Sequence, residues 1–336
     1  MLHKCLLENP QKLDLDISTR CIEINNVNLN HDIYKFIMED LKTKINFIGI
    51  GAQKSGTSWL YKQFEKSNQI DITPIKELHY FDRSQRYPSP NFLGVTKLFF
   101  RILNPKWTFR ALSTTLRDNK NSDWYKKWFF SNYSDEWYLS LFENFKKCKG
   151  EITPAYAILV ERDIKRMSKL LGANTKIIFL VRHPVERSWS SYKYKYGVKI
   201  FNESNLNHIK TYLRTHEQLS RSNYLDTINL YKKYFDTVFV GFFDAILENP
   251  KQLLNDIFEY LELNTEEINN FSGLNERVNT SKKLDIPKEI ESILNQLYEK
   301  QIEHLGLTYG EYFNNWDNQE ESIAEKSCAW KSSIII

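Results

Sequence analysis

The chain has 336 residues, enough for about two ordinary domains or for one large α/β domain. Its 46 lysines and arginines against 42 aspartates and glutamates leave a net charge of +4, too small to indicate a nucleic-acid-binding protein. Hydrophobic residues make up 41% of the sequence, which favours a folded protein over a disordered one.

The cysteines and the hydropathy pattern bear on the compartment. Cys5, Cys21, Cys148 and Cys328 form no CxxC pair and no zinc-type spacing, which argues against a disulfide scaffold and favours a reducing environment. No apolar run approaches the roughly 18 residues of a membrane span. The first residues also lack the apolar stretch of a secretory signal. We therefore expect a cytoplasmic protein.

Strand-like and helix-like segments alternate from residue 45 onward, after a stretch (1–44) that we expect to be an N-terminal appendage. Four apolar runs have strand character: 45–52, 149–152, 175–181 and 237–242. Helix-like segments lie between and after them: 57–67, 157–171, 184–196, 204–219, 222–235, 250–262 and 287–304. This alternation predicts an α/β fold with a P-loop-like, mainly parallel sheet, helices on both faces and ligands at the carboxyl ends of the strands. The polar segment 314–336 is expected to be a loose C-terminal tail.

The first strand runs into a loop with phosphate-binding character. Gly51 and Gly56 have the spacing of GxxxxGK[ST], but Thr57 stands where the lysine is expected, and Lys54 precedes Gly56 instead. Small residues let backbone N–H groups approach phosphate oxygens, and the following helix presents its positive end. Lys54 and the hydroxyls of Thr57 and Ser58 add donors. Taken alone, the segment could also be a glycine turn without a ligand.

The strand over 175–181 runs into a second motif. Arg182 follows it at the edge where an open α/β sheet binds its ligand. Pro184 suits the first turn of a helix, and Ser190 lies about two helical turns after Arg182. An arginine and a hydroxyl are suitable donors for a second phosphate. A solvated arginine with ordinary helix serines is the equal alternative.

Together the two motifs, KSGTSWL at 54–60 and RxPxxRxxSxY at 182–192, resemble those of the sulfotransferase family. Its members use 3′-phosphoadenosine 5′-phosphosulfate (PAPS) as donor. The resemblance covers roughly residues 45–313, which would form the sulfotransferase domain, and it implies two binding regions for the donor. The residues that it assigns to the 5′-phosphosulfate are Lys54, Ser55, Gly56, Thr57 and Ser58, with Trp59 against the adenine. Those that it assigns to the 3′-phosphate are Arg182 and Ser190.

A third segment, TPIKELHYFD at 73–82, resembles the KExHFFD segment of the carbohydrate sulfotransferases, particularly the heparan-sulfate type. In that branch a glutamate is the proposed general base, which implies Glu77 as the base here, with His79 and Lys54 as the other catalytic residues. A packed or capping histidine is the alternative for His79. The neighbours that are expected to contact the substrate are Lys76, Asp82 and Arg83.

Three further segments resemble the family more loosely. GEITPAY at 150–156 has Ile152 where a lysine often stands, so a substrate-side contact is expected to be missing. The helix at 222–235 has Ser222 in place of the family's glycine, and Tyr224 in it is counted with the donor-binding residues. ERVNTSKK at 276–283 takes the place of a basic loop near the 3′-phosphate. Its candidates are Arg277 and Lys282, and a solvated basic turn is the equal alternative.

A basic, aromatic insertion occupies residues 83–135. Between 83 and 127 it holds ten basic and two acidic residues, so the local charge is +8. Aromatic residues are interleaved: Phe92, Phe99, Phe100, Trp107 and Phe109. Such a segment can be an acceptor-side lid that attracts an anionic substrate, or it can rest on a membrane surface. The alternative is a solvated insertion whose aromatic side chains belong to the core.

We therefore predict an enzyme that moves a sulfuryl group from PAPS to a hydroxyl or amine of a carbohydrate, glycolipid or other small acceptor, with no metal and no nucleic acid. Glu77 would take the acceptor proton, and Lys54 would stabilise charge on the leaving phosphate. A P-loop nucleotide-dependent kinase is one alternative; it shares the fold, but the displaced lysine counts against it. A non-catalytic nucleotide-binding or membrane-surface protein is the other, and it would tolerate loss of Glu77.

Overall fold

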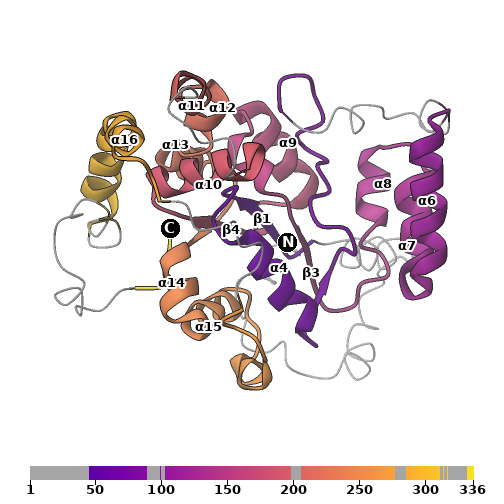
Figure 1. Cartoon of the computed structure of the whole chain (residues 1–336). Helices are drawn as coiled ribbons and strands as arrows, with labels where there is room; N and C mark the ends of the chain where they lie inside the picture. Colours follow the sequence, from indigo (N-terminus) through magenta and orange to yellow (C-terminus); the bar gives the residue numbers. More distant parts are fainter. Residues whose placement is uncertain are drawn as a thin grey trace. The chain divides into compact units, whose positions relative to one another are not determined.

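A six-stranded sheet organises the part of the chain that the computed structural model describes (Figure 1). The described residues are 45–88, 99, 103–197, 206–276, 285–310, 313, 316 and 331–336. They belong to one compact unit, Ile45–Ile336. The predicted appendage over 1–44 lies outside them, as do Arg277, Lys282, Phe92 and Phe100, so these assignments stay predictions.

The strand order is β2-β3-β1-β4-β5-β6. All neighbours among the first five strands are parallel, and β6 is antiparallel to β5. The strands are β1 (Phe47–Gly51), β2 (Ile70–Ile72), β3 (Cys148–Ile152), β4 (Lys176–Val181), β5 (Val238–Phe242) and β6 (Ser333–Ile335). The predicted mainly parallel sheet is therefore confirmed, with two short strands, β2 and β6, that the sequence analysis missed.

The helices follow the predicted segments, with one split, three added in or directly after the insertion, and one added directly after β5. The predicted helix at 204–219 is two helices, α11 (Leu206–Leu213) and α12 (His216–Ser220). The insertion forms α6 (Pro105–Arg117), α7 (Ser122–Phe130) and α8 (Asp135–Ser140). The other α-helices are α4 (Thr57–Lys66), α9 (Glu161–Leu171), α10 (Pro184–Tyr196), α13 (Tyr224–Lys232), α14 (Phe243–Glu248), α15 (Pro250–Tyr260) and α16 (Lys288–Tyr309). Short 3₁₀ turns lie at Asn119–Asn121, Pro154–Ile158 and Thr265–Asn270.

Side chains alternate along the central strands between two cores, one on each face of the sheet. In β4, Ile177 and Phe179 join the core that includes residues of α9, α10, α13 and α16, whereas Ile178 and Leu180 join the core with α4 and α15. Figure 1 shows these two groups of helices on opposite sides of the strands. The central strands are buried on both faces, and this explains why their sequences are continuously apolar.

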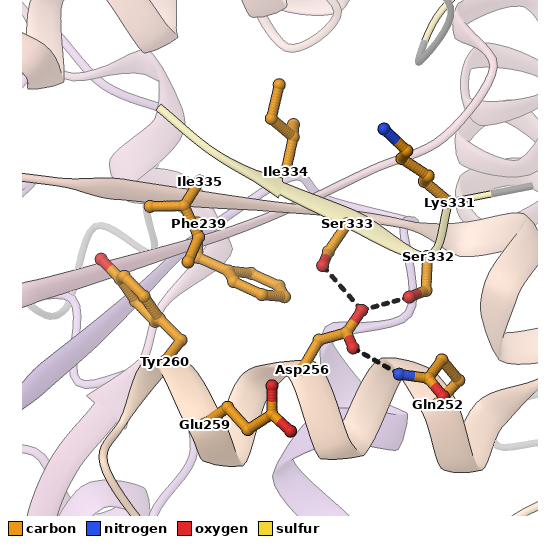
Figure 2. Close-up of a pocket in the computed structure, with 10 residues that line it drawn as sticks. All are labelled: Phe239, Gln252, Asp256, Glu259, Tyr260, Lys331, Ser332, Ser333, Ile334 and Ile335. Atoms are coloured by element: carbon orange, nitrogen blue, oxygen red, sulfur yellow. Dashed lines mark hydrogen bonds between the residues drawn. The ribbon is translucent and has the colours of Figure 1, made fainter.

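The end of the predicted C-terminal tail is ordered as a strand and not loose. The Val238 N–H donates to the Ile336 carbonyl at 2.9 Å, and the Ile336 N–H donates back to Val238 at 2.9 Å. The hydroxyls of Ser332 and Ser333 both donate to Asp256 on α15, beside a cavity that β6 and α15 enclose (Figure 2). Because β5 would otherwise present an unpaired edge, the isoleucine-rich segment covers it.

The aromatic side chains of the insertion divide between core and surface. Those of α7 and α8 are buried in the larger core: Trp124, Tyr125, Trp128, Phe129, Trp137 and Tyr138. On α6, in contrast, Phe109 is 74% exposed. Of the interleaved aromatic residues named in the sequence analysis, Trp107 packs against the core and Phe99 and Phe109 are exposed.

A buried arginine explains the serine that replaces the family's glycine before α13. Arg187 on α10 is fully buried, and its Nε donates to the Ser222 hydroxyl at 2.6 Å. Its Nη2 donates to the Ser188 hydroxyl at 2.8 Å and to the Gln218 carbonyl at 3.0 Å. The hydroxyl of Ser222 therefore supplies an acceptor that a glycine could not.

Removal of that acceptor is expected to destabilise the protein. Ser222→Ala should lower the free energy of unfolding by about 1–3 kcal/mol, because a buried charged donor loses its partner. Denaturant unfolding measures the change, and Ser272→Ala, at an exposed position, is the control. Equal stability of the two variants would contradict this account of Arg187.

Candidate active site

A cavity of about 550 Å³ lies where the carboxyl ends of the parallel strands meet. It is bordered by the loop after β1, the start of α4 and the loop at 76–77, which follows β2. The segments that follow β3, β4 and β5 complete its border. The lining residues are Gln53, Lys54, Gly56, Thr57, Ser58, Trp59, Lys76, Glu77, Pro154, Arg182, Ser190, Tyr194, Phe243, Ile246, Leu247, Leu274, Asn275 and Glu276. The predicted base, loop lysine and second-motif arginine therefore share one cavity.

The loop after β1 exposes the N-terminus of α4 to this cavity. Gly56 has a left-handed backbone (φ 92°), and a Cβ there would lie 2.3 Å from Ile246 Cδ1, so the position requires glycine. No side chain caps the helix at Gly56, and its first turn holds no acidic residue. Its first N–H groups, beside the lining residues Thr57 and Ser58, are thus suited to an anion.

Lys54 belongs to a group of cations around the cavity. Its Nζ lies 4.1 Å from the ring centre of Tyr194. Burial, followed by the charges of Arg182 and Lys76, lowers the pKa of Lys54 below its ordinary value. Clustered cations raise each other's free energy, so this arrangement indicates an anionic ligand.

Arg182 reaches the cavity from the end of β4. Its Nε and Nη2 donate to Glu186 Oε2 at 3.0 and 2.8 Å, and its guanidinium lies 4.2 Å from the ring centre of Phe243. The Arg182 carbonyl accepts a hydrogen bond of 2.7 Å from the hydroxyl of Tyr224. Ser190, on α10, lines the same cavity. An anion bound at Arg182 would share the guanidinium with Glu186.

An apolar part of the cavity can take a flat ring. Trp59 is 3% exposed, and its Nε1 donates to the Leu274 carbonyl at 2.9 Å, which fixes the indole. Phe243, Ile246 and Leu274 line the cavity with it. Aromatic and aliphatic surfaces of this kind suit a planar base.

Glu77 lies at the mouth of the cavity, with its side chain 39% exposed. Its Oε1 is 2.6 Å from Lys76 Nζ, and its Oε2 is 3.4 Å from His79 Nε2. Burial raises the pKa of Glu77, but the hydrogen bond with His79 and the charge of Lys76 outweigh it and lower the pKa to about 2. The carboxylate is therefore ionised at neutral pH and can accept a proton.

His79 connects Glu77 to a buried carboxylate. Its Nδ1 lies 2.7 Å from Asp82 Oδ2, and the Asp82 side chain is fully buried. Burial lowers the pKa of His79, but the hydrogen bonds with Asp82 and Glu77 dominate and raise it to about 9. His79 is thus an imidazolium at neutral pH, which favours the charged form of Glu77 and makes the ring a poor base itself.

A carboxylate that the sequence analysis did not single out holds the loop that carries Glu77. Glu151 on β3 is fully buried and accepts hydrogen bonds from the Leu78 N–H at 3.3 Å and the Thr153 hydroxyl at 2.7 Å. The hydroxyls of Tyr138 and Tyr156 donate to it at 2.8 and 3.0 Å. An acid surrounded by aromatic and hydroxyl residues in GEITPAY was the available signal.

Five predicted site residues that the structure describes do not line the cavity: His79, which contacts Glu77, and four others. Ser55 and Tyr224 are fully buried and lie behind the loop and the end of β4. Asp82 is buried under His79. Arg83 lies over the ring of Tyr133 at 4.0 Å, and its Nε donates to the His79 carbonyl at 2.8 Å. These four side chains lie away from the cavity lining, and the ligand or substrate contacts expected of them stay predictions.

At Ile152 a contact with the substrate was expected to be missing. Ile152 is fully buried, and its Cγ1 would lie 2.8 Å from a Cβ at Gly49, so it packs against the first strand and does not face the cavity.

Among the described residues, no group of three or more His, Cys, Asp or Glu side chains is arranged to hold a metal ion. No helix in the described ranges is long and apolar enough to cross a membrane.

Several lining residues were missed in the sequence, notably Tyr194 and Phe243. Phe243 directly follows β5, so the rule that ligands bind at the carboxyl ends of parallel strands was enough to find it. Tyr194 lies one turn after Ser190 on α10, and helical spacing could have placed it beside the same ligand.

Comparison with known proteins bears on the family and the fold of the chain. The family model described as a sulfotransferase domain matches residues 46–304. A search of curated proteins found no match. Among solved structures, a sulfotransferase from Alicyclobacillus acidocaldarius is similar in fold, with a TM-score of 0.56 and 18% sequence identity over 82% of this chain and 99% of that one. The match of the family model across most of the sequence shows that the chain belongs to the sulfotransferase family.

Proposed function

We propose that the chain transfers a sulfuryl group from PAPS to a hydroxyl or amine of a carbohydrate, glycolipid or other small acceptor. Family membership supports sulfuryl transfer as the reaction class. The observation that carries the proposal is the meeting of an ionised Glu77, the cation of Lys54 and the open N-terminus of α4 in one cavity. A proton acceptor and an anion-binding region are the two parts that such a transfer needs.

The cavity volume of about 550 Å³ lies in the ordinary range for small-molecule and cofactor sites, and the character of the lining supports PAPS as the donor. The N-terminus of α4 and Lys54 would hold the 5′-phosphosulfate, and Arg182 with Ser190 would hold the 3′-phosphate. Trp59 and Phe243 would contact the adenine. When bound, PAPS supplies a sulfuryl group that is attached to a phosphate leaving group.

The residues of the chain have separate tasks in this proposal. Glu77 takes the proton from the acceptor, while Lys76 and His79 keep its carboxylate ionised and oriented. Lys54 and the first N–H groups of α4 stabilise the negative charge that the leaving phosphate gains. Asp82 holds the ring of His79 from behind, at 2.7 Å.

The acceptor class rests on the segment that carries the base. Residues 73–82 resemble the carbohydrate branch of the family, and this favours a sugar hydroxyl or amine. The basic surface of the insertion would favour an anionic acceptor, or a membrane surface, near the site. Localisation in the cytoplasm stays a prediction.

The first prediction concerns the base. Glu77→Gln keeps the shape of the side chain but removes its ability to accept a proton. It should lower kcat by about 10²–10⁴-fold, the usual contribution of general base catalysis, and leave the affinity for 3′,5′-adenosine diphosphate nearly unchanged. Radiolabelled PAPS with a panel of glycans, glycolipids and phenols measures the rate. Near-normal turnover, or a larger loss in His79→Ala, would mean that Glu77 is not the base.

The second prediction concerns the 3′-phosphate. Arg182→Ala should weaken binding of 3′,5′-adenosine diphosphate by roughly 2–5 kcal/mol, because one partner of a desolvated charge pair is lost. Binding of ADP, which lacks the 3′-phosphate, should change little. Calorimetric titration measures both constants, with Arg214→Ala, at an exposed position, as the control. Equal losses for the two nucleotides would contradict the assignment.

The third prediction concerns the charge of His79. A pKa of about 9 in the folded protein, against 6.5 for an ordinary histidine, means that its protonation stabilises the fold fully below pH 6.5. This stabilisation, up to about 3 kcal/mol, should be lost as the pH rises through 9. Denaturant unfolding at pH 6.5 and 9.5 should show the loss in the wild type and in His216→Asn, but not in His79→Asn. A pH dependence that persists in His79→Asn would refute the assignment.

A further inference from the structure

We propose that α6 docks the protein on the surface of an anionic lipid bilayer. The helix carries an apolar ridge, made of Phe109, Leu112 and Leu116, and a basic strip beside it, made of Lys106, Arg110 and Arg117. Helices with this division lie in the plane of a membrane interface, with the apolar side chains among the acyl chains and the cations at the lipid phosphates.

The ridge is exposed to an unusual extent for this protein. Phe109, Leu112 and Leu116 are 74%, 49% and 75% exposed. Just before the helix, Phe99 and Leu103 are 67% and 63% exposed. Five of the nine exposed large hydrophobic side chains among the described residues thus fall between 99 and 116. Scattered exposed leucines are ordinary, but a cluster of this kind indicates an interaction surface.

The basic strip follows one side of the ridge. At 3.6 residues per turn, Phe109, Leu112 and Leu116 fall within about 60° of each other, and the three cations are centred about 100° further round the helix. All three cations are on exposed residues. None of them forms a salt bridge with another residue in the described ranges, so their charges face outward.

The opposite face of α6 packs against the rest of the protein, so the apolar ridge faces away from it. Ala111 is fully buried and Thr115 is 9% exposed. Trp107 packs edge-on against Phe129 of α7, with ring centres 5.7 Å apart. Figure 1 shows α6 as the outermost of the three insertion helices in this view. The helix is therefore anchored on one side and presents its ridge on the other.

A bilayer fits this surface better than a second copy of the chain. The ridge is only one helix wide, whereas a stable protein interface buries roughly 800 Å² on each partner. A two-fold contact through the ridge would also bring the basic strips of the two copies close together, and like charges oppose such a contact. Anionic lipid can contact both parts of this surface: its acyl chains can contact the ridge, and its phosphates can contact the basic strip.

Vesicle flotation with the full chain tests the proposal. The wild type should float with phosphatidylcholine vesicles that contain phosphatidylserine, less so at high salt, and bind weakly to phosphatidylcholine alone. Phe109→Ser with Leu116→Ser should weaken binding at least tenfold, because two apolar side chains that would enter the bilayer are lost. The control is Leu307→Ser on α16, a leucine that is 78% exposed. All variants should keep the wild-type melting temperature, because the side chains are at the surface.

A charge-reversal pair tests the basic component. Arg110→Glu with Arg117→Glu should weaken binding roughly 30-fold or more. Lys251→Glu with Lys300→Glu changes the net charge equally at exposed positions elsewhere, and it should have a much smaller effect.

Three results would overturn the proposal. One is wild-type binding by the ridge variant. Another is equal loss in the two charge-reversal pairs, which would indicate a diffuse electrostatic attraction. The last is a dimer of the wild type that the ridge variant abolishes, which would assign the ridge to a second copy of the chain.

Discussion

One buried carboxylate determines where the proposed base can be. Glu151 accepts hydrogen bonds from two tyrosines, one threonine and the Leu78 N–H. Tyr156, one of these tyrosines, also accepts a hydrogen bond of 2.8 Å from the Tyr80 N–H. Glu77 and His79 alternate with these two anchored residues, and both have left-handed backbones, with φ of 66° and 51°. Such backbones are costly for residues other than glycine, so they persist only where the surroundings fix them.

The Glu151 network explains how ionisable groups of the site can be close together and still have distinct charges. Burial raises the pKa of Glu151, in spite of its four donors, while Glu77 and His79 form an ion pair at the mouth of the cavity. The rigid loop keeps Glu77 next to Lys76 and out of the fully buried environment. Their different surroundings thus shift the pKa values of the two carboxyl groups in opposite directions.

The sequence could predict the parallel sheet because its central strands are buried on both faces and therefore read as continuous apolar runs. It could also bring Lys54 and Arg182 together, because each follows a strand end, whereas Glu77 was identified through the resemblance of residues 73–82. It could not predict the directions of the Asp82 and Arg83 side chains. A motif specifies residue types, but not the rings, carbonyls and imidazole that contact these side chains in the fold. Glu151 was missed although three of its partners are 2, 5 and 13 residues away; only its contact with the Leu78 N–H, 73 residues away, depends on the fold. The three-residue strands β2 and β6 depend on neighbours more than on local sequence.

Arg83 has a consequence for how far the insertion is a separable module. Its guanidinium lies near the rings of Trp128, Tyr133 and Trp137 in the insertion, and it donates to the carbonyls of His79 and, at 3.2 Å, Leu78. The insertion and the base-bearing loop therefore share one side chain. An exchange of residues 83–135 between relatives would have to preserve the contacts of Arg83 with Trp137 and with the carbonyls of Leu78 and His79, which lie outside the exchanged segment, and natural variation in these segments is expected to be correlated.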